Sequence, residues 1–120
     1  MGTGHRLGEW GENTARVMLE LCGYECLDRR FRRPGGEIDL VMRQGQTLVF
    51  VEVKTRGAGA IAPAEDFFGG HQLRRLRRMA LLWLNEYPNT SAEELRFDLV
   101  AINIAGSSGG LSLQHLVGVG

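Results

Sequence analysis

Acidic and amine side chains alternate with apolar, strand-forming residues in two short segments of the sequence. The first segment, 36–40, contains Asp39, and the second, 49–56, contains Glu52 and Lys54 on either side of Val53. Side chains two residues apart lie on the same face of a strand, so Glu52 and Lys54 share one. A polar stretch with a central glycine separates the segments, which predicts an antiparallel hairpin. The hairpin would bring two carboxylates and one amine together on one face of a sheet.

This set of side chains favours metal-dependent hydrolysis of a phosphodiester. Asp39 and Glu52 offer the carboxylate oxygens that Mg²⁺ and Mn²⁺ prefer. A divalent ion held there can supply hydroxide near neutral pH and neutralise charge on a phosphate. Lys54 could orient or activate the attacking water, or stabilise the developing charge. The chain has 13 arginines and this single lysine, and the two cations are not interchangeable in such a role. The competing interpretation is a solvated strand face, where alternating charges are common.

The two segments also resemble a known family. Asp39, followed after the turn by Glu52-Val53-Lys54, resembles the D…(D/E)-x-K signature of restriction-endonuclease-like nucleases. The wider pattern, over residues 8–104, resembles the YraN family of small bacterial proteins, relatives of archaeal Holliday junction resolvases. The matching residues are Gly8, Gly11-Glu12, Ala15, Leu19, Gly23-Tyr24, Arg32, Gly36-Glu37-Ile38-Asp39-Leu40, 49–56 and Arg96-Phe97-Asp98.

The resemblance implies a restriction-endonuclease-like core in which Mg²⁺ or Mn²⁺ is held by Asp39 and Glu52, with Glu12 as a third acidic group. From position alone, Glu12 is better explained as an acid favoured near a helix N-terminus by the helix dipole. The resemblance also implies DNA as substrate, including branched or recombination intermediates, and a two-fold homodimer, because a four-way junction requires two cuts. The chain departs from the family at His71, where Lys is frequent, and at Arg30, where Asn is frequent.

Arginine clusters predict where nucleic acid would bind. The formal net charge is zero, so the distribution of charge matters more than its sum. Eight of the 13 arginines fall within residues 29–33 and 74–78, where they could contact backbone phosphates. A charged edge strand and a solvated helix face are the competing interpretations. The predicted nucleic-acid-binding residues are Arg30, Arg32, Arg33, Arg56, Arg74, Arg75 and Arg78.

Composition and element order predict a single domain over residues 1–120, of the α/β (α+β) class. The chain is 43% hydrophobic, enough to bury one core. We expect a mixed central sheet flanked by two main helices, at about 8–22 and 64–87. The strands are expected at 24–33 (at or near an edge), 37–42, 47–54, 95–105 and 111–117, with residues 1–7 frayed and 57–63 a flexible loop.

Two further acids are expected outside the catalytic set. Glu37 shares a face with Asp39 and could be a ligand, but it is interpreted as a neighbour at the mouth of the strand, because Asp39 and Glu52 already supply the minimum set of ligands. Asp98 is interpreted as structural, paired with an arginine. The sequence shows no secretory signal and no membrane span, and Cys22 and Cys26 form no disulfide or zinc framework, which favours a cytoplasmic location.

A second function is consistent with the same residues. The chain could be a module that binds nucleic acid or a protein partner with this fold and little or no cleavage. The complete set of Asp39, Glu52 and Lys54 favours the nuclease, since a binding protein has no need of it. The sequence does not distinguish DNA from RNA.

Overall fold

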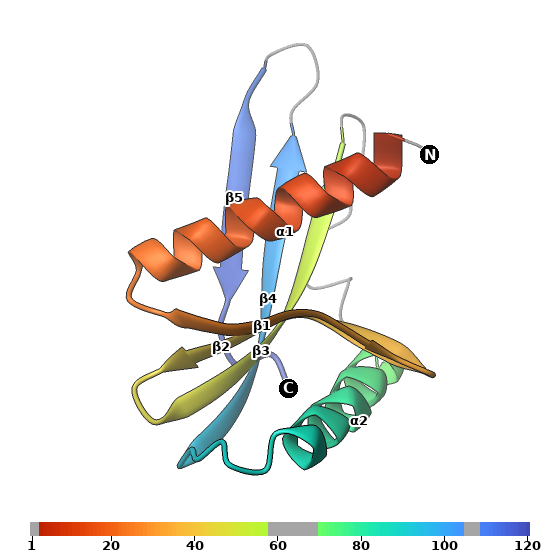
Figure 1. The fold of residues 1–120 in the computed structure, drawn as a ribbon. Helices are drawn as coiled ribbons and strands as arrows, with labels where there is room; N and C mark the ends of the chain where they lie inside the picture. Colours follow the sequence, from red (N-terminus) through yellow and green to blue (C-terminus); the bar gives the residue numbers. More distant parts are fainter. Residues whose placement is uncertain (1–2, 58–69, 105–108) are drawn as a thin grey trace.

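The computed structural model describes residues 3–57, 70–104 and 109–120, and it has helices on both faces of one five-stranded sheet (Figure 1). The strand order is β1-β2-β3-β4-β5. Strands β1 to β3 form an antiparallel meander, β3 and β4 are parallel, and β4 and β5 are antiparallel. This mixed α+β arrangement confirms the predicted fold class and is consistent with a restriction-endonuclease-like core. The elements are α1 (Thr3–Leu21), β1 (Glu25–Arg33), β2 (Gly36–Gln44), β3 (Thr47–Arg56), α2 (Gly70–Glu86), β4 (Glu94–Ile104) and β5 (Leu111–Leu116).

The observed elements differ from the predicted ones mainly at their ends. Helix α1 begins at Thr3, whereas apolar periodicity had placed its start at residue 8. The hairpin strands β2 and β3 are both longer than predicted and are joined at Gly45, whose φ of 60° suits glycine. Strand β1 lies at the edge of the sheet, as predicted. Most of the expected flexible loop, 58–63, and the expected first part of the second helix, 64–69, lie outside the described residues.

Two apolar clusters form the core, one on each face of the sheet. Helix α1 packs Ala15 and Leu19 against β2, β3 and β4. Helix α2 packs residues including Leu76 and Trp83 against the opposite face. Because β3 and β4 are parallel neighbours joined through α2, the helix crosses over the sheet and its N-terminal part lies near the C-terminal end of β3. That end of β3 carries Glu52 and Lys54, so the crossover places α2 beside these two candidate catalytic residues.

The close approach of α1 to β3 depends on Gly11. A Cβ atom at this position would lie 1.8 Å from Oγ1 of Thr55, far inside van der Waals contact. We expect Gly11→Ala to lower the free energy of unfolding by about 1–3 kcal/mol, the range found for overpacked sites. Chemical denaturation monitored by circular dichroism measures this change.

Gly8→Ala is the matched control, because a Cβ there meets nothing within 4 Å. Gly8 also lies within α1, so this substitution is expected to stabilise the chain by roughly 0.5–1 kcal/mol through helix propensity. Equal effects of the two substitutions would contradict the close packing of α1 on β3.

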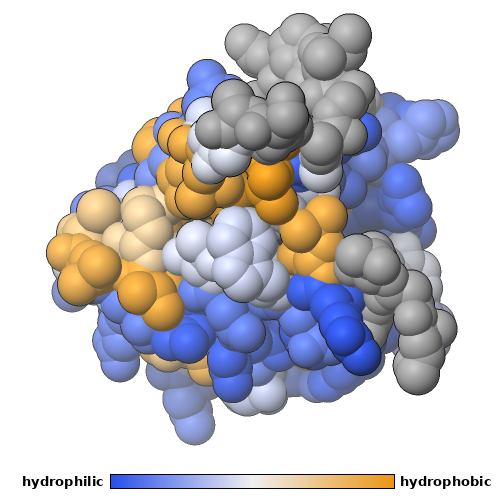
Figure 2. All heavy atoms as spheres, turned by 90° about the horizontal axis from the view of Figure 1, so that it is seen from above, coloured by the Kyte–Doolittle hydropathy of each residue, from blue (hydrophilic) through white to orange (hydrophobic). Residues whose placement is uncertain are grey.

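The surface combines polar and apolar regions. Figure 2 shows hydrophobic residues gathered among hydrophilic ones on the face seen from above. On α1, the exposed large apolar side chains are Trp10, Val17 and Leu21, whose spacing places them along one side of the helix. None of the described helices combines the length and hydropathy that crossing a membrane requires.

Candidate active site

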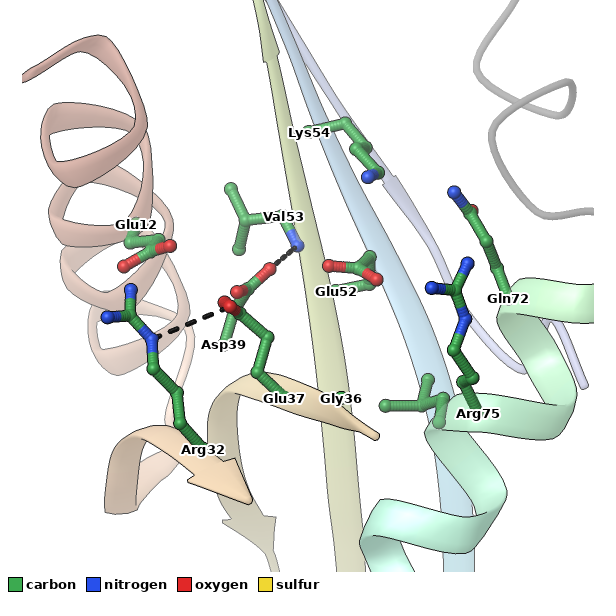
Figure 3. Close-up of a pocket in the computed structure, with 11 residues that line it drawn as sticks. Glu12, Arg32, Gly36, Glu37, Asp39, Glu52, Val53, Lys54, Gln72 and Arg75 are labelled. Atoms are coloured by element: carbon green, nitrogen blue, oxygen red, sulfur yellow. Dashed lines mark hydrogen bonds and ion pairs between the residues drawn. The ribbon is translucent and has the colours of Figure 1, made fainter. Parts of the chain in front are cut away.

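A pocket of about 560 Å³ opens between α1, the β2–β3 hairpin and α2 (Figure 3). It brings together the four predicted catalytic residues: Glu12 from α1, Asp39 from β2, and Glu52 and Lys54 from β3. Period-2 alternation explains why the last two reach the same hollow. The remaining lining residues are Arg32, Gly36, Glu37, Val53, Gln72, Arg75 and Leu76.

Asp39 is held firmly within the hairpin. The backbone pairing of β2 with β3 extends as far as Leu40 and Val51. Beyond this pair, Oδ2 of Asp39 accepts a hydrogen bond from the N–H of Val53 at 2.7 Å, so the side chain takes the place of a ladder bond. Asp39 is only 4% exposed, because apolar core residues flank it on β2. The hydrogen bond from Val53 and the surrounding core residues therefore hold its carboxyl group in position.

The surroundings of Asp39 disfavour its negative charge. Burial is the main cause that raises the pKa of Asp39 from 3.8 to about 8, and the neighbouring carboxyl of Glu52 adds to it. The hydrogen bond from Val53 acts in the opposite direction, and the charge of Glu37 adds to the increase. Burial, together with the two neighbouring carboxylates, thus favours the protonated form of Asp39.

Glu12 faces Asp39 from α1, whereas Glu52 and Lys54 enter the pocket from β3. Burial raises the pKa of Glu12, and the nearby carboxyl of Asp39 raises it further, while the hydrogen bond from Arg30 lowers it. Nε of Arg30 donates to Oε1 of Glu12 at 2.8 Å, and a second guanidinium nitrogen lies 3.7 Å from Glu9. Glu12 is therefore shared between the acidic pocket and an ion pair with β1.

Arg30 occupies a strained backbone position next to the site. Its φ of 53° lies in the left-handed region, and among the described residues it is the only one besides glycines with positive φ. The neighbours Arg29 and Phe31 pair with Leu40 and Ile38 of β2, so this kink lies beside Asp39. Asn adopts this conformation more readily than other non-glycine residues, which agrees with the Asn expected there from the family resemblance.

The kink coincides with a break in the alternation of β2. Ile38 and Val41, three residues apart, both pack in the cluster under α2, whereas Leu40 packs in the cluster under α1. A regular strand would place Ile38 and Leu40 on the same face. Asp39 therefore lies where β2 turns its apolar side chains from one face to the other.

Two cations of the pocket lack acidic partners. Within the described part of the chain, neither Lys54 nor Arg75 makes an ion pair, although four carboxylates line the same pocket. The third cation, Arg32, lies 3.5 Å from Glu37. Lys54 and Arg75 are thus available to an anionic ligand.

The other arginines predicted to bind nucleic acid occupy different surroundings. Arg30 lines a second, smaller pocket of about 270 Å³ with Glu12. Arg33 makes a bidentate ion pair with Glu86 of α2. Arg56 is half-buried at the end of β3, and Arg74 and Arg78 are exposed on α2. The structure therefore brings Arg32 and Arg75 to the pocket and Arg30 to its border, and leaves the others outside the lining.

Gln72 was not anticipated from the sequence. It lines the pocket, and its Oε1 atom is buried without a hydrogen-bond partner among the described residues. The available signal was helical spacing, since Gln72 precedes the buried Leu76 by one turn and so shares its side of α2. Using that signal requires knowing which side of α2 faces the site.

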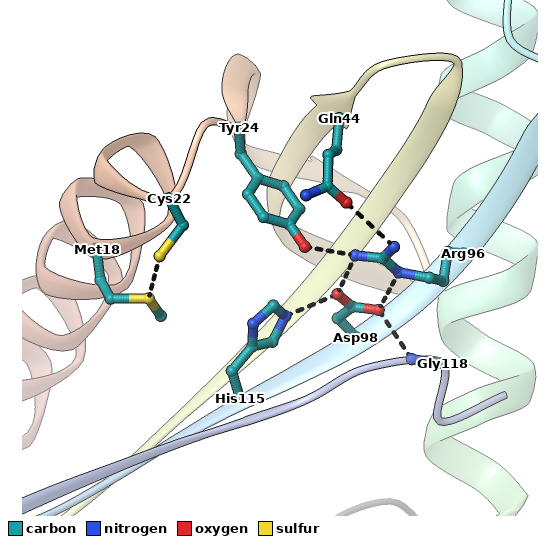
Figure 4. Close-up of polar contacts among 8 residues, drawn as sticks. All are labelled: Met18, Cys22, Tyr24, Gln44, Arg96, Asp98, His115 and Gly118. Atoms are coloured by element: carbon teal, nitrogen blue, oxygen red, sulfur yellow. Dashed lines mark hydrogen bonds and ion pairs between the residues drawn. The ribbon is translucent and has the colours of Figure 1, made fainter.

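Asp98 belongs to a separate polar network (Figure 4). It is fully buried and accepts hydrogen bonds from Arg96 at 2.9 Å and from the N–H of Gly118 at 3.0 Å, while His115 lies 2.7 Å away. Burial favours the protonated form of Asp98, but these contacts outweigh it and lower the pKa. Arg96 also donates to the hydroxyl of Tyr24. Asp98 therefore joins β4, β5 and the C-terminal segment, which confirms its predicted structural role and pairing with an arginine.

Comparisons with known proteins agree with the predicted family. The model of the family described as "Uncharacterised protein family UPF0102" matches residues 11–102, a range that includes all four predicted catalytic residues. A UPF0102 protein of Beutenbergia cavernae is 44% identical over 114 residues, covering 95% of each chain.

Other relatives are similar over most of the chain as well. A UPF0102 protein of Parvibaculum lavamentivorans is 47% identical over 82% of this chain and 72% of its own length. One from Geobacter metallireducens is 42% identical over 83% of this chain and 81% of its own. The predicted relation to the YraN family is thus confirmed, and the chain belongs to the uncharacterised protein family UPF0102.

Proposed function

We propose that this protein is a metal-dependent endonuclease that hydrolyses phosphodiester bonds in DNA. The observation that carries the proposal is the convergence of Asp39, Glu52 and Lys54 on one pocket, with Asp39 buried. Branched or recombination intermediates as substrates, and a two-fold homodimer, follow from the family resemblance. The exposed apolar row of Trp10, Val17 and Leu21 on α1 supports association with a second copy.

The residues of the pocket fit Mg²⁺ or Mn²⁺. Asp39 and Glu52 supply adjacent carboxylates, and their mutual repulsion raises the proton affinity of Asp39, which a bound cation would reverse. No three Asp, Glu, His or Cys side chains in the described ranges are arranged to hold one ion. Two carboxylates completed by water and a substrate phosphate are typical of Mg²⁺ sites in nucleotide-processing proteins. Glu12 then assists from α1 across Asp39.

In this proposal the residues share the work of one displacement. When bound, the ion would lower the pKa of a coordinated water and neutralise phosphate charge. The attacking water gives up one proton to solvent as its oxygen bonds to phosphorus, the bond from phosphorus to the leaving oxygen breaks, and the leaving oxygen takes up a proton from solvent. Lys54, with no acidic partner among the described residues, orients the water or stabilises the charge of the transition state. The hydrogen bond from the N–H of Val53 to Asp39 keeps the carboxylate oxygens of Asp39 in place.

A binding module with little or no cleavage is the second candidate. The observation that favours it is the engagement of Glu12 by Arg30, together with the absence of a three-acid metal arrangement in the part of the chain that the structure describes. In that case Lys54 and Arg75, which make no ion pair within the described part of the chain, would bind a phosphate without hydrolysing it.

Incubation with labelled DNA separates the two candidates. Linear, flapped and four-way substrates are incubated with the protein in Mg²⁺, in Mn²⁺ and with chelator, and the products are resolved by denaturing electrophoresis. We expect cleavage that requires the metal and is strongest on branched DNA. Binding of the same substrates without cleavage under every metal condition would favour the binding module.

A further inference from the structure

Helix α2 directs two polar side chains into the pocket. Its buried stripe consists of Leu76, Met79, Ala80 and Trp83. Gln72 lies one turn before Leu76, and Arg75 one turn before Met79, so both follow the side of the helix that faces the sheet. Figure 3 shows them extending from α2 toward the hairpin side of the pocket, where Glu52 and Lys54 lie. The other arginines of α2, Arg74, Arg77 and Arg78, do not line the pocket.

Arg75 carries a charge that the described residues do not neutralise. It makes no ion pair with the described residues. Glu86, an acidic residue of the same helix, is paired with Arg33 of β1. A guanidinium can contact two oxygens of a phosphate at once. Because it enters from α2 the pocket that Asp39 and Glu52 line from the hairpin, it fits a phosphate whose remaining oxygens face these carboxylates.

Gln72 has an unmet hydrogen-bonding capacity. Its Oε1 atom is buried and has no hydrogen-bond partner among residues 3–57, 70–104 and 109–120, and a buried acceptor without a hydrogen bond is unfavourable. An acceptor does not bind a phosphate oxygen, which is itself an acceptor at neutral pH. It does bind a water molecule or an ammonium group. Lys54 is one such donor available in the site, because it lines the same pocket and makes no ion pair with the described residues.

We propose that Gln72 and Arg75 form the substrate-positioning arm of the active site. Arg75 binds non-bridging oxygens of the phosphate that is cleaved, opposite the acidic residues. Gln72 accepts a hydrogen bond from the attacking water or from Lys54 and so sets the direction of attack. This inference rests on the proposed nuclease function and assigns to Arg75 a role different from that of the outward arginines of the same helix.

Single-turnover cleavage with the variants Arg75→Ala and Gln72→Leu tests the proposal, with Arg77→Ala as the matched control. Arg77 has the same charge on the same helix and is exposed like Arg75, but it does not line the pocket. We expect Arg75→Ala to lower the cleavage rate about 100-fold and to weaken DNA binding. Gln72→Leu should lower the rate about tenfold with unchanged DNA binding, and Gln72→Glu, which keeps the acceptor, should recover part of it. Arg77→Ala should remain within about twofold.

Stability and binding measurements distinguish the possible failures. Gln72→Leu removes an unsatisfied buried acceptor, so its Tm should equal or exceed that of the wild type even though the rate falls. If the wild type binds DNA but does not cleave it, the proposed function fails, while weaker binding by Arg75→Ala than by Arg77→Ala still supports the phosphate contact. Equal effects of Arg75→Ala and Arg77→Ala on both rate and binding would overturn the arm.

Discussion

Glu52→Gln is expected to abolish metal-dependent cleavage while leaving DNA binding in chelator unchanged. The amide keeps the size of the side chain but removes the negative charge of one of the two carboxylates, Glu52 and Asp39, that would hold the ion. We expect a loss of at least about 10³-fold in the single-turnover rate, comparable to removal of a principal source of transition-state stabilisation. Rapid-quench kinetics in Mg²⁺ and fluorescence anisotropy in chelator measure the two quantities separately.

Glu37→Gln serves as the control for this substitution. Glu37 lines the same pocket, but it lies beside Arg32 at the end of β2 and is interpreted as a neighbour of the site. Its loss should lower the rate less than about tenfold, as expected for a residue that acts on the site indirectly. Similar rates for the two variants would mean that Glu52 has no special role.

Asp39→Asn is expected to stabilise the metal-free protein while removing activity. In the wild type, the N–H of Val53 donates to Oδ2 of Asp39 at 2.7 Å. The amide oxygen of Asn can still accept this hydrogen bond, and the repulsion between Asp39 and Glu52 disappears. At pH 8 to 9, we expect the free energy of unfolding to rise by about 1–3 kcal/mol, since a buried, uncompensated charge is removed. Denaturant titrations in chelator measure this gain, and the cleavage assay measures the loss of activity.

The pH dependence gives the same substitution a sharper signature. The pKa of Asp39 is raised from its ordinary value of 3.8 to about 8 in the folded state, so between these values the folded protein binds more protons than the unfolded chain. The contribution of Asp39 is therefore most favourable below pH 3.8, and it is lost as the pH rises toward 8. The stability advantage of Asp39→Asn should grow over this interval and level off above it. A constant advantage, or a variant less stable than the wild type at pH 9, would contradict the burial of an unneutralised acid.

Much of the site was predictable because it is local in sequence. Period-2 alternation is enough to place Glu52 and Lys54 on one face of β3, and the turn at Gly45 returns the chain so that Asp39 lies beside them. The matching acid on α1, Glu12, came only from the family resemblance, because helix periodicity says nothing about which strand a helix crosses.

The remaining features depend on contacts between distant parts of the chain. The left-handed φ of Arg30 on β1 coincides with a break in the alternation of β2 near Asp39. The sequence pattern of alternating residues predicts neither feature. The inward direction of Gln72 and Arg75 depends on how α2 crosses the parallel pair β3 and β4. The ion pair of Arg33 with Glu86 joins residues 53 positions apart, so a predicted phosphate ligand proved to be engaged within the protein.

Titration of the protein with Mn²⁺, followed by electron paramagnetic resonance, tests the shared metal site most directly. Free Mn²⁺ gives a sharp signal that is lost on binding, so the stoichiometry and affinity can be read without any substrate. We predict saturable binding by the wild type, a loss of at least about tenfold in affinity for both Asp39→Asn and Glu52→Gln, and little change for Glu37→Gln. Mn²⁺ binding of equal strength in all four proteins, or none in the wild type even with DNA present, would contradict a metal ion held between Asp39 and Glu52.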